Sequence, residues 1–166
     1  YAYSLYPETY WDLRDILVVV STAEKVVSST EGHKEAKQSI FYKTRIDQAN
    51  KLLPKIKQAL NQKKISTFGE ITEKDCLSMH AVMMTSSPPL FYWLPKTVEI
   101  IRSVYQWRSK GLEVYFTIDA GPNVHLICEA HDEVSVLEKV RKIDGIKKII
   151  VNKPAKGASL INNHLF

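Results

Sequence analysis

The sequence predicts an α+β fold, a ferredoxin-like split β-α-β sheet with extra helices. Three observations support it. The β-branched apolar run 16–20 is typical of a strand buried on both faces. Two further strands, 112–118 and 124–129, flank a Gly-Pro turn, and a helical segment, 133–143, precedes an apolar strand at 146–151. The order strand, helices, strand, strand, helix, strand is that of a split β-α-β sheet with helices inserted after its first strand.

Three helical patterns fill the stretch between the first strand and the Gly-Pro turn. The first is a charged segment over about 40–53, which we expect Pro54 to kink or divide because proline lacks a backbone N–H. The second covers 66–84 and ends before a Ser-Pro-Pro sequence. The third begins at Pro95, since proline suits the first turn of a helix. In the tail, residues 158–161 could add an edge strand.

Length and composition favour a single domain over residues 1–166. The chain has 166 residues, of which 45% are hydrophobic, enough for a real core. Lys and Arg outnumber Asp and Glu by 23 to 18, a net charge of +5 that is dispersed in the manner of solvated helix faces. We therefore expect no nucleic-acid partner.

The cysteines indicate a reducing compartment, and the apolar runs indicate neither a membrane-spanning segment nor a leader. Cys76 and Cys128 belong to no CxxC motif or Cys/His cluster, so neither a disulfide framework nor a zinc site is expected. The longest apolar runs are too short to cross a bilayer, and no basic-then-apolar leader precedes them. We expect a cytoplasmic protein with no membrane partner.

The most informative motif is the segment 117–123, which places Asp119 just before Gly121 and Pro122. Gly and Pro cannot extend a strand ladder, so the chain must turn there. Rigid scaffolds often hold functional groups in such loops. Asp119 could equally brace the turn, because Asp readily hydrogen-bonds its own backbone two residues on. The residues alone leave both roles open.

His80 is a lone histidine within an apolar helical pattern. It lies near Met79 and Met83, which share that pattern. Such a histidine is more often a core residue whose ring nitrogens bond nearby backbone than a ligand or a catalyst. We therefore interpret His80 as part of the core.

Three segments in order, 28–32, 79–92 and 116–123, resemble the C-terminal half of the diphosphomevalonate decarboxylases, members of the GHMP kinase superfamily. The resemblance covers nearly the whole chain. The third segment is its most specific part and is shared with phosphomevalonate decarboxylases. The resemblance implies a GHMP kinase C-terminal domain, a homodimer, and an N-terminal nucleotide-binding domain that is absent from this chain. The chain begins with Tyr1 rather than Met, as a cut chain would.

The resemblance implies ATP-dependent conversion of mevalonate 5-diphosphate to isopentenyl diphosphate, with release of ADP, phosphate and carbon dioxide. Asp119 matches the family's catalytic aspartate. A β-hydroxy acid decarboxylates readily only when its hydroxyl becomes a leaving group, which phosphorylation achieves. A carboxylate within hydrogen-bond reach of that hydroxyl could accept its proton or hold its oxygen in line with the phosphate.

The resemblance also implies substrate-binding roles for Ser29, Thr30, Gly32 and His33, which match the family's loop against the substrate phosphates. Hydroxyls and free N–H groups at a helix start suit an anion. A plain helix cap is the alternative role for the Ser-Thr pair. This sequence has His33 where Met usually follows that glycine, and bacterial members often carry Arg in place of Thr30. These departures bear on the choice between a monophosphate and a diphosphate substrate.

ATP and Mg²⁺ are implied by the resemblance, but the chain lacks a loop to cradle nucleotide phosphates. Its six glycines are scattered, and no GxGxxG motif or P-loop is present. We therefore expect the absent N-terminal half to bind both, no metal ligand in this chain, and no activity from this chain alone.

Two other function classes stay open. One is a relative that phosphorylates the 3-hydroxyl of mevalonate without decarboxylation, although such relatives replace the aspartate that Asp119 matches. The other is a ferredoxin-like module that binds a small ligand or RNA through its sheet. RNA-binding sheets of this kind carry a basic and aromatic signature on their strands, which 114–118 and 124–128 lack.

Overall fold

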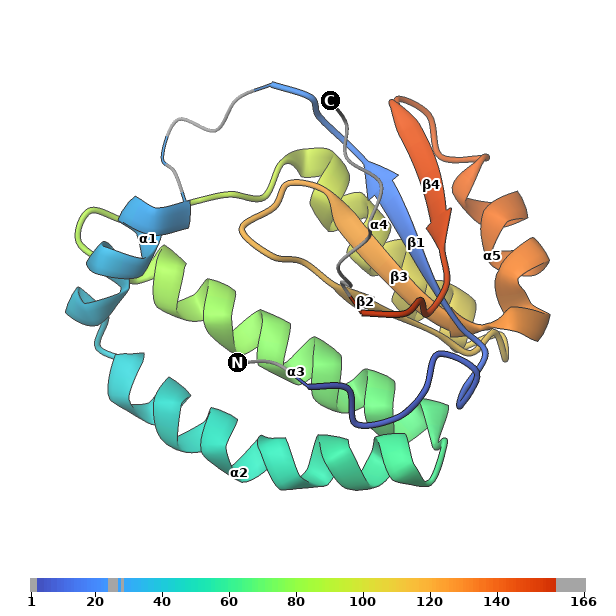
Figure 1. Cartoon of the computed structure of the whole chain (residues 1–166). Coiled ribbons are helices and arrows are strands. Elements are labelled where there is room, and N and C mark those ends of the chain that lie inside the picture. The colour runs from blue at the N-terminus through green and yellow to red at the C-terminus, as the bar shows by residue number, and fades with distance from the viewer. Residues whose placement is uncertain (1–2, 24–26, 28, 158–166) are drawn as a thin grey trace, which may run out of the picture.

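Four antiparallel strands form a sheet in the order β2-β3-β1-β4 (Figure 1). The computed structural model describes residues 3–23, 27 and 29–157. The strands are β1 (Leu13–Val19), β2 (Val114–Thr117), β3 (Val124–Glu129) and β4 (Lys148–Asn152). With β1 between β3 and β4, this is the order of a split β-α-β sheet, so the predicted α+β ferredoxin-like fold is confirmed.

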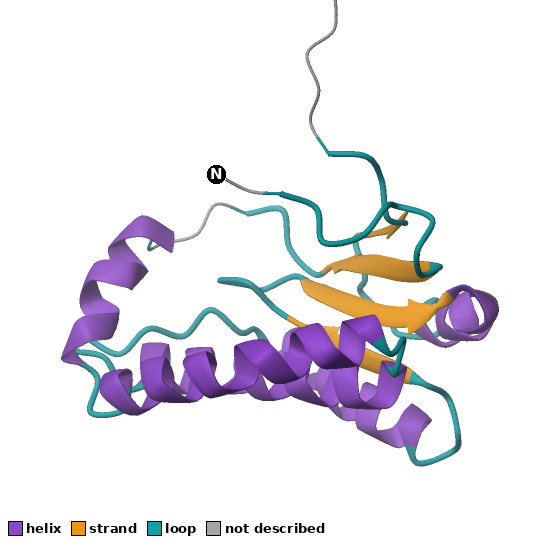
Figure 2. Cartoon of the chain, turned by 60° about the horizontal axis from the view of Figure 1, so that its bottom comes forward, coloured by secondary structure: helices purple, strands orange, loops and turns teal. Residues whose placement is uncertain are grey.

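Five α-helices occur in the described part of the chain: α1 (Ser29–Glu35), α2 (Tyr42–Asn61), α3 (Ile65–Met84), α4 (Pro95–Arg108) and α5 (Glu133–Val140). Figure 2 shows α2 and α3 running along one side of the sheet, with α1 apart at their far end. The helix α2 continues through Pro54, so of the two predicted effects, a kink or a division, the division is wrong. Pro54 is exposed, where water can bind the carbonyl that its missing N–H leaves free.

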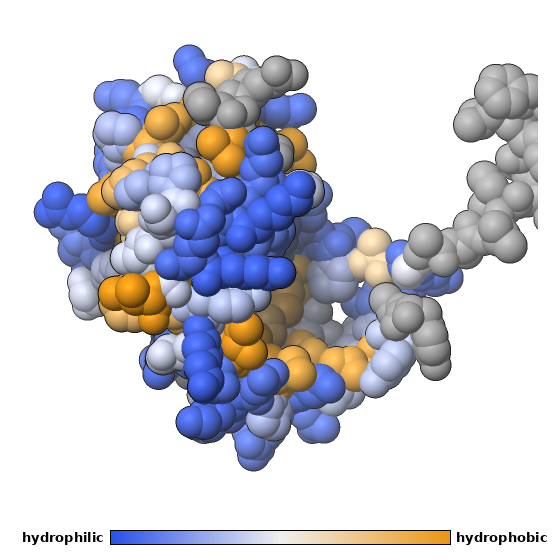
Figure 3. Space-filling view, turned by 90° about the vertical axis from the view of Figure 1, so that its left-hand side faces the viewer, coloured by the Kyte–Doolittle hydropathy of each residue, from blue (hydrophilic) through white to orange (hydrophobic). Residues whose placement is uncertain are grey.

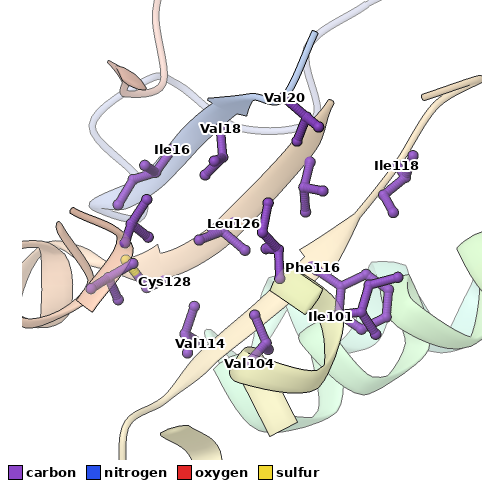
Figure 4. Close-up of a cluster of buried hydrophobic side chains, with 14 of the residues drawn as sticks. Ile16, Val18, Val20, Ile101, Val104, Val114, Phe116, Ile118, Leu126 and Cys128 are labelled. Carbon is purple, nitrogen blue, oxygen red and sulfur yellow. The ribbon is translucent and has the colours of Figure 1, made fainter. Parts of the chain in front are cut away.

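The core lies between the sheet and the helices α4 and α5 (Figure 4). Alternate strand residues point into it, because side chains along a strand alternate between faces. The fully buried contributors include Ile16, Val18, Leu126, Val104 and Val136. Burying each such side chain stabilises the fold by roughly 1.5–3 kcal/mol.

The opposite face of the sheet is less buried than the sequence predicts. It carries Asp15 and Leu17 of β1 and their neighbours His125 and Ile127 of β3, all of which are half-buried. The run 16–20 is therefore not buried completely on both faces. The strand also begins earlier than predicted, at Leu13.

Other boundaries also differ from the sequence prediction. The strand β2 covers Val114–Thr117, shorter at both ends than the predicted 112–118, and Asp119 lies in the loop that follows it. The helix α5 ends at Val140 rather than at the predicted 143, and hydrogen-bonded turns follow it. The predicted edge strand at 158–161 lies outside the described residues.

The helix α3 covers the free edge of β2. The carboxylate of Glu73 accepts the backbone N–H of Phe116 at 3.2 Å and pairs with both terminal nitrogens of Arg108 at 2.7 and 3.0 Å. A Cβ on Gly69 would lie 2.0 Å from the ring of Tyr115, so only glycine permits this close approach. These contacts fix α3 against β2, and with it the residues near the C-terminal end of α3.

Candidate active site

Asp119 lies in the loop between β2 and β3, with its side chain exposed. The preceding Ile118 is 1% exposed and points into the core, which anchors the start of the loop (Figure 4). Gly121 has a φ of +84°, a conformation that favours glycine, and a Cβ there would lie 3.3 Å from the backbone oxygen of Tyr92. The chain thus makes a tight turn at Gly121, and the loop packs against the segment that precedes α4.

Two side chains hold the far side of this loop. The Oδ1 of Asn123 accepts the backbone N–H groups of Val20 and Ser21 at 2.8 and 3.2 Å. The hydroxyl of Thr97 donates to the carbonyl of Pro122 at 2.7 Å. Each such bond contributes about 0.5–1.5 kcal/mol. Together they tie the loop to the end of β1 and the start of α4, which limits the movement of Asp119.

His80 of α3 holds the near side of the loop. It is 2% exposed, and its Nε2 lies 3.2 Å from the carbonyl oxygen of Ile118. The Sγ of Cys76, one turn earlier on α3, donates to the same oxygen at 3.6 Å. Burial lowers the pKa of His80, although contacts with the Ile118 and Asp119 backbone and the Asp119 carboxylate oppose this. The prediction of a buried histidine bonded to backbone is confirmed.

A pocket of about 290 Å³ opens beside Asp119, lined by His33 of α1, Met79, His80 and Met83 of α3, Tyr92, and Asp119 and Ala120 of the loop. Figure 3 shows this side of the molecule, which is hollowed and has hydrophobic side chains within the hollow. Apolar walls around a few polar groups are typical of small-molecule sites. Electrostatic interactions are stronger in such surroundings than in water.

The structure brings together two of the five residues predicted to form the site. Asp119 and His33 line the same pocket. Gly32 is buried behind it, where a Cβ would lie 2.4 Å from the hydroxyl of Tyr92, so glycine allows α1 to approach the pocket wall.

The other two predicted residues lie at the start of α1, and Thr30 does not line this pocket. Ser29 is the first residue of the helix, and Thr30 follows it with an exposed side chain. The substrate-binding role that the sequence predicts for Thr30 therefore requires a ligand that extends beyond the pocket.

Sequence reasoning assigned no pocket role to Met79, Met83 or His80. Their spacing on α3 shows that they share a helix face, but the same spacing is typical of an ordinary core. Only the contact between α3 and a loop 38 residues further along the chain distinguishes a pocket wall from a core.

The described residues contain no group of three or more His, Cys, Asp or Glu side chains placed to hold a metal ion. Cys76 and Cys128 are buried free thiols, and burial raises their pKa values to about 11 and about 12. Such thiols are poor nucleophiles because the reactive form is the thiolate. Among the helices described, none is long and apolar enough to cross a membrane.

The chain is similar to known decarboxylases over most of its length. A family model described as the mevalonate 5-diphosphate decarboxylase C-terminal domain matches residues 16–161. A diphosphomevalonate decarboxylase from Aspergillus fumigatus is 33% identical over 144 residues, which are 84% of this chain and 36% of that protein. A phosphomevalonate decarboxylase from Haloferax volcanii is 29% identical over 117 residues, 69% of this chain and 36% of that protein.

Solved structures show the same similarity. One, described as MDDEF in complex with MVAPP, AMPPCP and magnesium, matches with a TM-score of 0.79 and 30% identity, covering 86% of this chain and 44% of that one. The chain therefore spans less than half the length of each of these relatives.

Proposed function

Because the chain belongs to the mevalonate 5-diphosphate decarboxylase C-terminal domain family, we propose that it is part of an ATP-dependent decarboxylase. The enzyme would convert mevalonate 5-diphosphate to isopentenyl diphosphate and release ADP, phosphate and carbon dioxide. The observation that carries the proposal is the position of Asp119, an exposed carboxylate on a firmly held loop at the edge of an apolar pocket.

Asp119 would act on the tertiary hydroxyl of the substrate. From its loop the carboxylate can reach a ligand in the pocket, where it would accept the hydroxyl proton or hold the oxygen in line for phosphorylation. The side chains of Met79 and Met83 would exclude water from this proton transfer. Carbon dioxide would leave once the hydroxyl had become a phosphate leaving group.

The substrate phosphates would extend from the pocket toward the start of α1. Ser29 and Thr30 begin that helix, Gly32 brings it close to Tyr92, and His33 reaches the pocket itself. Hydroxyls and N–H groups at this position suit phosphate oxygens. A second candidate function is phosphomevalonate decarboxylation, which the similarity to the Haloferax volcanii protein favours.

ATP and Mg²⁺ would be bound by an N-terminal nucleotide-binding domain outside this chain. The described residues supply no cluster of metal-binding side chains, so they do not fit Mg²⁺ by themselves. The alignments cover 36% of each of the two relatives, which leaves room for such a domain. We expect the complete enzyme to be a cytoplasmic homodimer and the isolated chain to be inactive.

The proposal is tested by joining the chain to its N-terminal half and supplying ATP with mevalonate 5-diphosphate or mevalonate 5-phosphate. Carbon dioxide released from the diphosphate, together with isopentenyl diphosphate, is the expected result. Release from the monophosphate alone would favour the second candidate. Phosphorylated product without carbon dioxide would indicate a kinase, and no turnover of either compound would contradict the decarboxylase assignment.

A further inference from the structure

We propose that His80 is a positioning residue for the reaction. It orients the Asp119 carboxylate by fixing the peptide unit between Ile118 and Asp119. This inference rests on the decarboxylase function proposed above. It extends that function to a side chain on α3 that the sequence indicates only as part of the core.

Two side chains of α3 contact the carbonyl that directly precedes Asp119. The oxygen of Ile118 lies 3.2 Å from Nε2 of His80 and 3.6 Å from Sγ of Cys76. The Ile118 carbonyl and the Asp119 backbone nitrogen belong to one planar peptide unit. Two donors on that carbonyl therefore fix the orientation from which the Asp119 side chain departs.

The chemistry of this contact determines the state of the imidazole. A carbonyl oxygen can only accept a hydrogen bond, so Nε2 of His80 carries the proton. The ring is 2% exposed, and its centroid lies 4.7 Å from that of Trp93. Such a buried environment favours the neutral ring. A neutral His80 holds the loop without placing a positive charge beside Asp119, which would make the carboxylate a weaker base.

His80 holds a different part of the loop from the other two anchoring side chains. Thr97 and Asn123 hold the far side of the turn, beyond Gly121. His80 holds the side that carries Asp119 and also lines the pocket. Loss of His80 would leave the turn attached but leave the Asp119 peptide held only by the weak thiol donor of Cys76, so that it could rotate more easily. A displacement of about 1 Å at such a site can cost about 10²-fold in rate.

The test uses the complete enzyme with two replacements of similar size. His80→Leu removes the donor, whereas His80→Gln keeps an N–H near the position of Nε2. We expect His80→Leu to lower kcat for carbon dioxide release by roughly 10–100-fold, with a KM for mevalonate 5-diphosphate within about twofold of wild type. His80→Gln should keep kcat within about fivefold of wild type.

A matched control separates positioning from stability. Cys128→Ala truncates a fully buried residue of β3 that does not line the pocket. It should lower the midpoint of thermal unfolding and leave kcat unchanged. A wild-type kcat in His80→Leu, or equal losses in the Leu and Gln variants, would overturn the inference.

Nitrogen-15 NMR of the imidazole supplies a readout that needs neither turnover nor a folded variant. A neutral ring protonated at Nε2 at neutral pH is expected, and a charged ring or one protonated at Nδ1 would overturn the inference. If the wild-type enzyme releases no carbon dioxide, the proposed function fails. The NMR signals would then still decide whether His80 holds the Ile118 carbonyl.

Discussion

Two histidines near Asp119 have opposite protonation preferences, because their surroundings differ. Burial lowers the pKa of His80 on α3. The carboxylate of Asp15, 2.9 Å from Nδ1 of His125, raises the pKa of His125 on β3, and burial opposes this only in part. As the pH falls below about 6.5, protonation of the unfolded state weakens the fold through His80. Through His125 the fold is instead strengthened at higher pH, as the pH falls from the raised folded pKa towards about 6.5.

His125→Gln should destabilise the protein in a manner that depends on pH. Because the folded state binds the His125 proton more tightly, the stabilisation is fully present below the unfolded pKa of about 6.5 and is lost as pH rises through the higher folded pKa. The loss in the free energy of unfolding should therefore be larger at pH 5.5 than at pH 8.5 in urea titrations. His131→Gln, at a side chain that is 69% exposed, is the control. A loss that grows with pH would contradict this account.

At the scale of elements, α3 connects the sheet edge to the site. Near its middle, Glu73 binds the Phe116 N–H of β2 and pairs with Arg108 of α4. Towards its C-terminal end, His80 binds the Ile118 carbonyl. Burial raises the pKa of Glu73, while Arg108 and the Phe116 N–H oppose that change. The ion pair with Arg108 thus offsets the cost of burying the Glu73 carboxylate. The same carboxylate gives the Phe116 N–H, on the edge strand β2, a hydrogen-bond acceptor.

Glu73→Ala should lower the free energy of unfolding by roughly 3–5 kcal/mol, because it leaves Arg108 half-buried without its partner and Phe116 without an acceptor. Glu70→Ala, at an exposed position one turn earlier on the same helix, should change it by less than about 0.5 kcal/mol. Chemical denaturation of both variants measures the difference. Equal losses would show that the buried pair does not secure α3.

The elements themselves were largely predictable from local patterns. Helical spacing predicted α3 and the proline start predicted α4, because both depend on residues close in sequence. The continuity of α2 through Pro54 was not predicted, since it depends on which side of the helix faces water. The end of α5 at Val140 was also missed, because apolar spacing continues into the turns that follow.

At the scale of the whole molecule, the fold gathers α1, α3 and the β2–β3 loop around one pocket. The sequence motif identified Asp119 and its loop, because Gly121 and Pro122 define the turn locally. The pocket walls could not be predicted in the same way, since His33 and Met79 meet Asp119 only through long-range packing. The predicted roles of Ser29 and Thr30 stay predictions that depend on a bound substrate.

The most direct test of the account is carbon dioxide release from mevalonate 5-diphosphate by the complete enzyme carrying Asp119→Asn. The amide keeps the size of the side chain but cannot accept the hydroxyl proton, so kcat should fall by about 10²–10⁴-fold. Asp144→Asn makes the same change at an exposed position outside the pocket and should leave kcat unchanged. An Asp119→Asn enzyme that released carbon dioxide at the wild-type rate would contradict the assignment of this pocket as the site of decarboxylation.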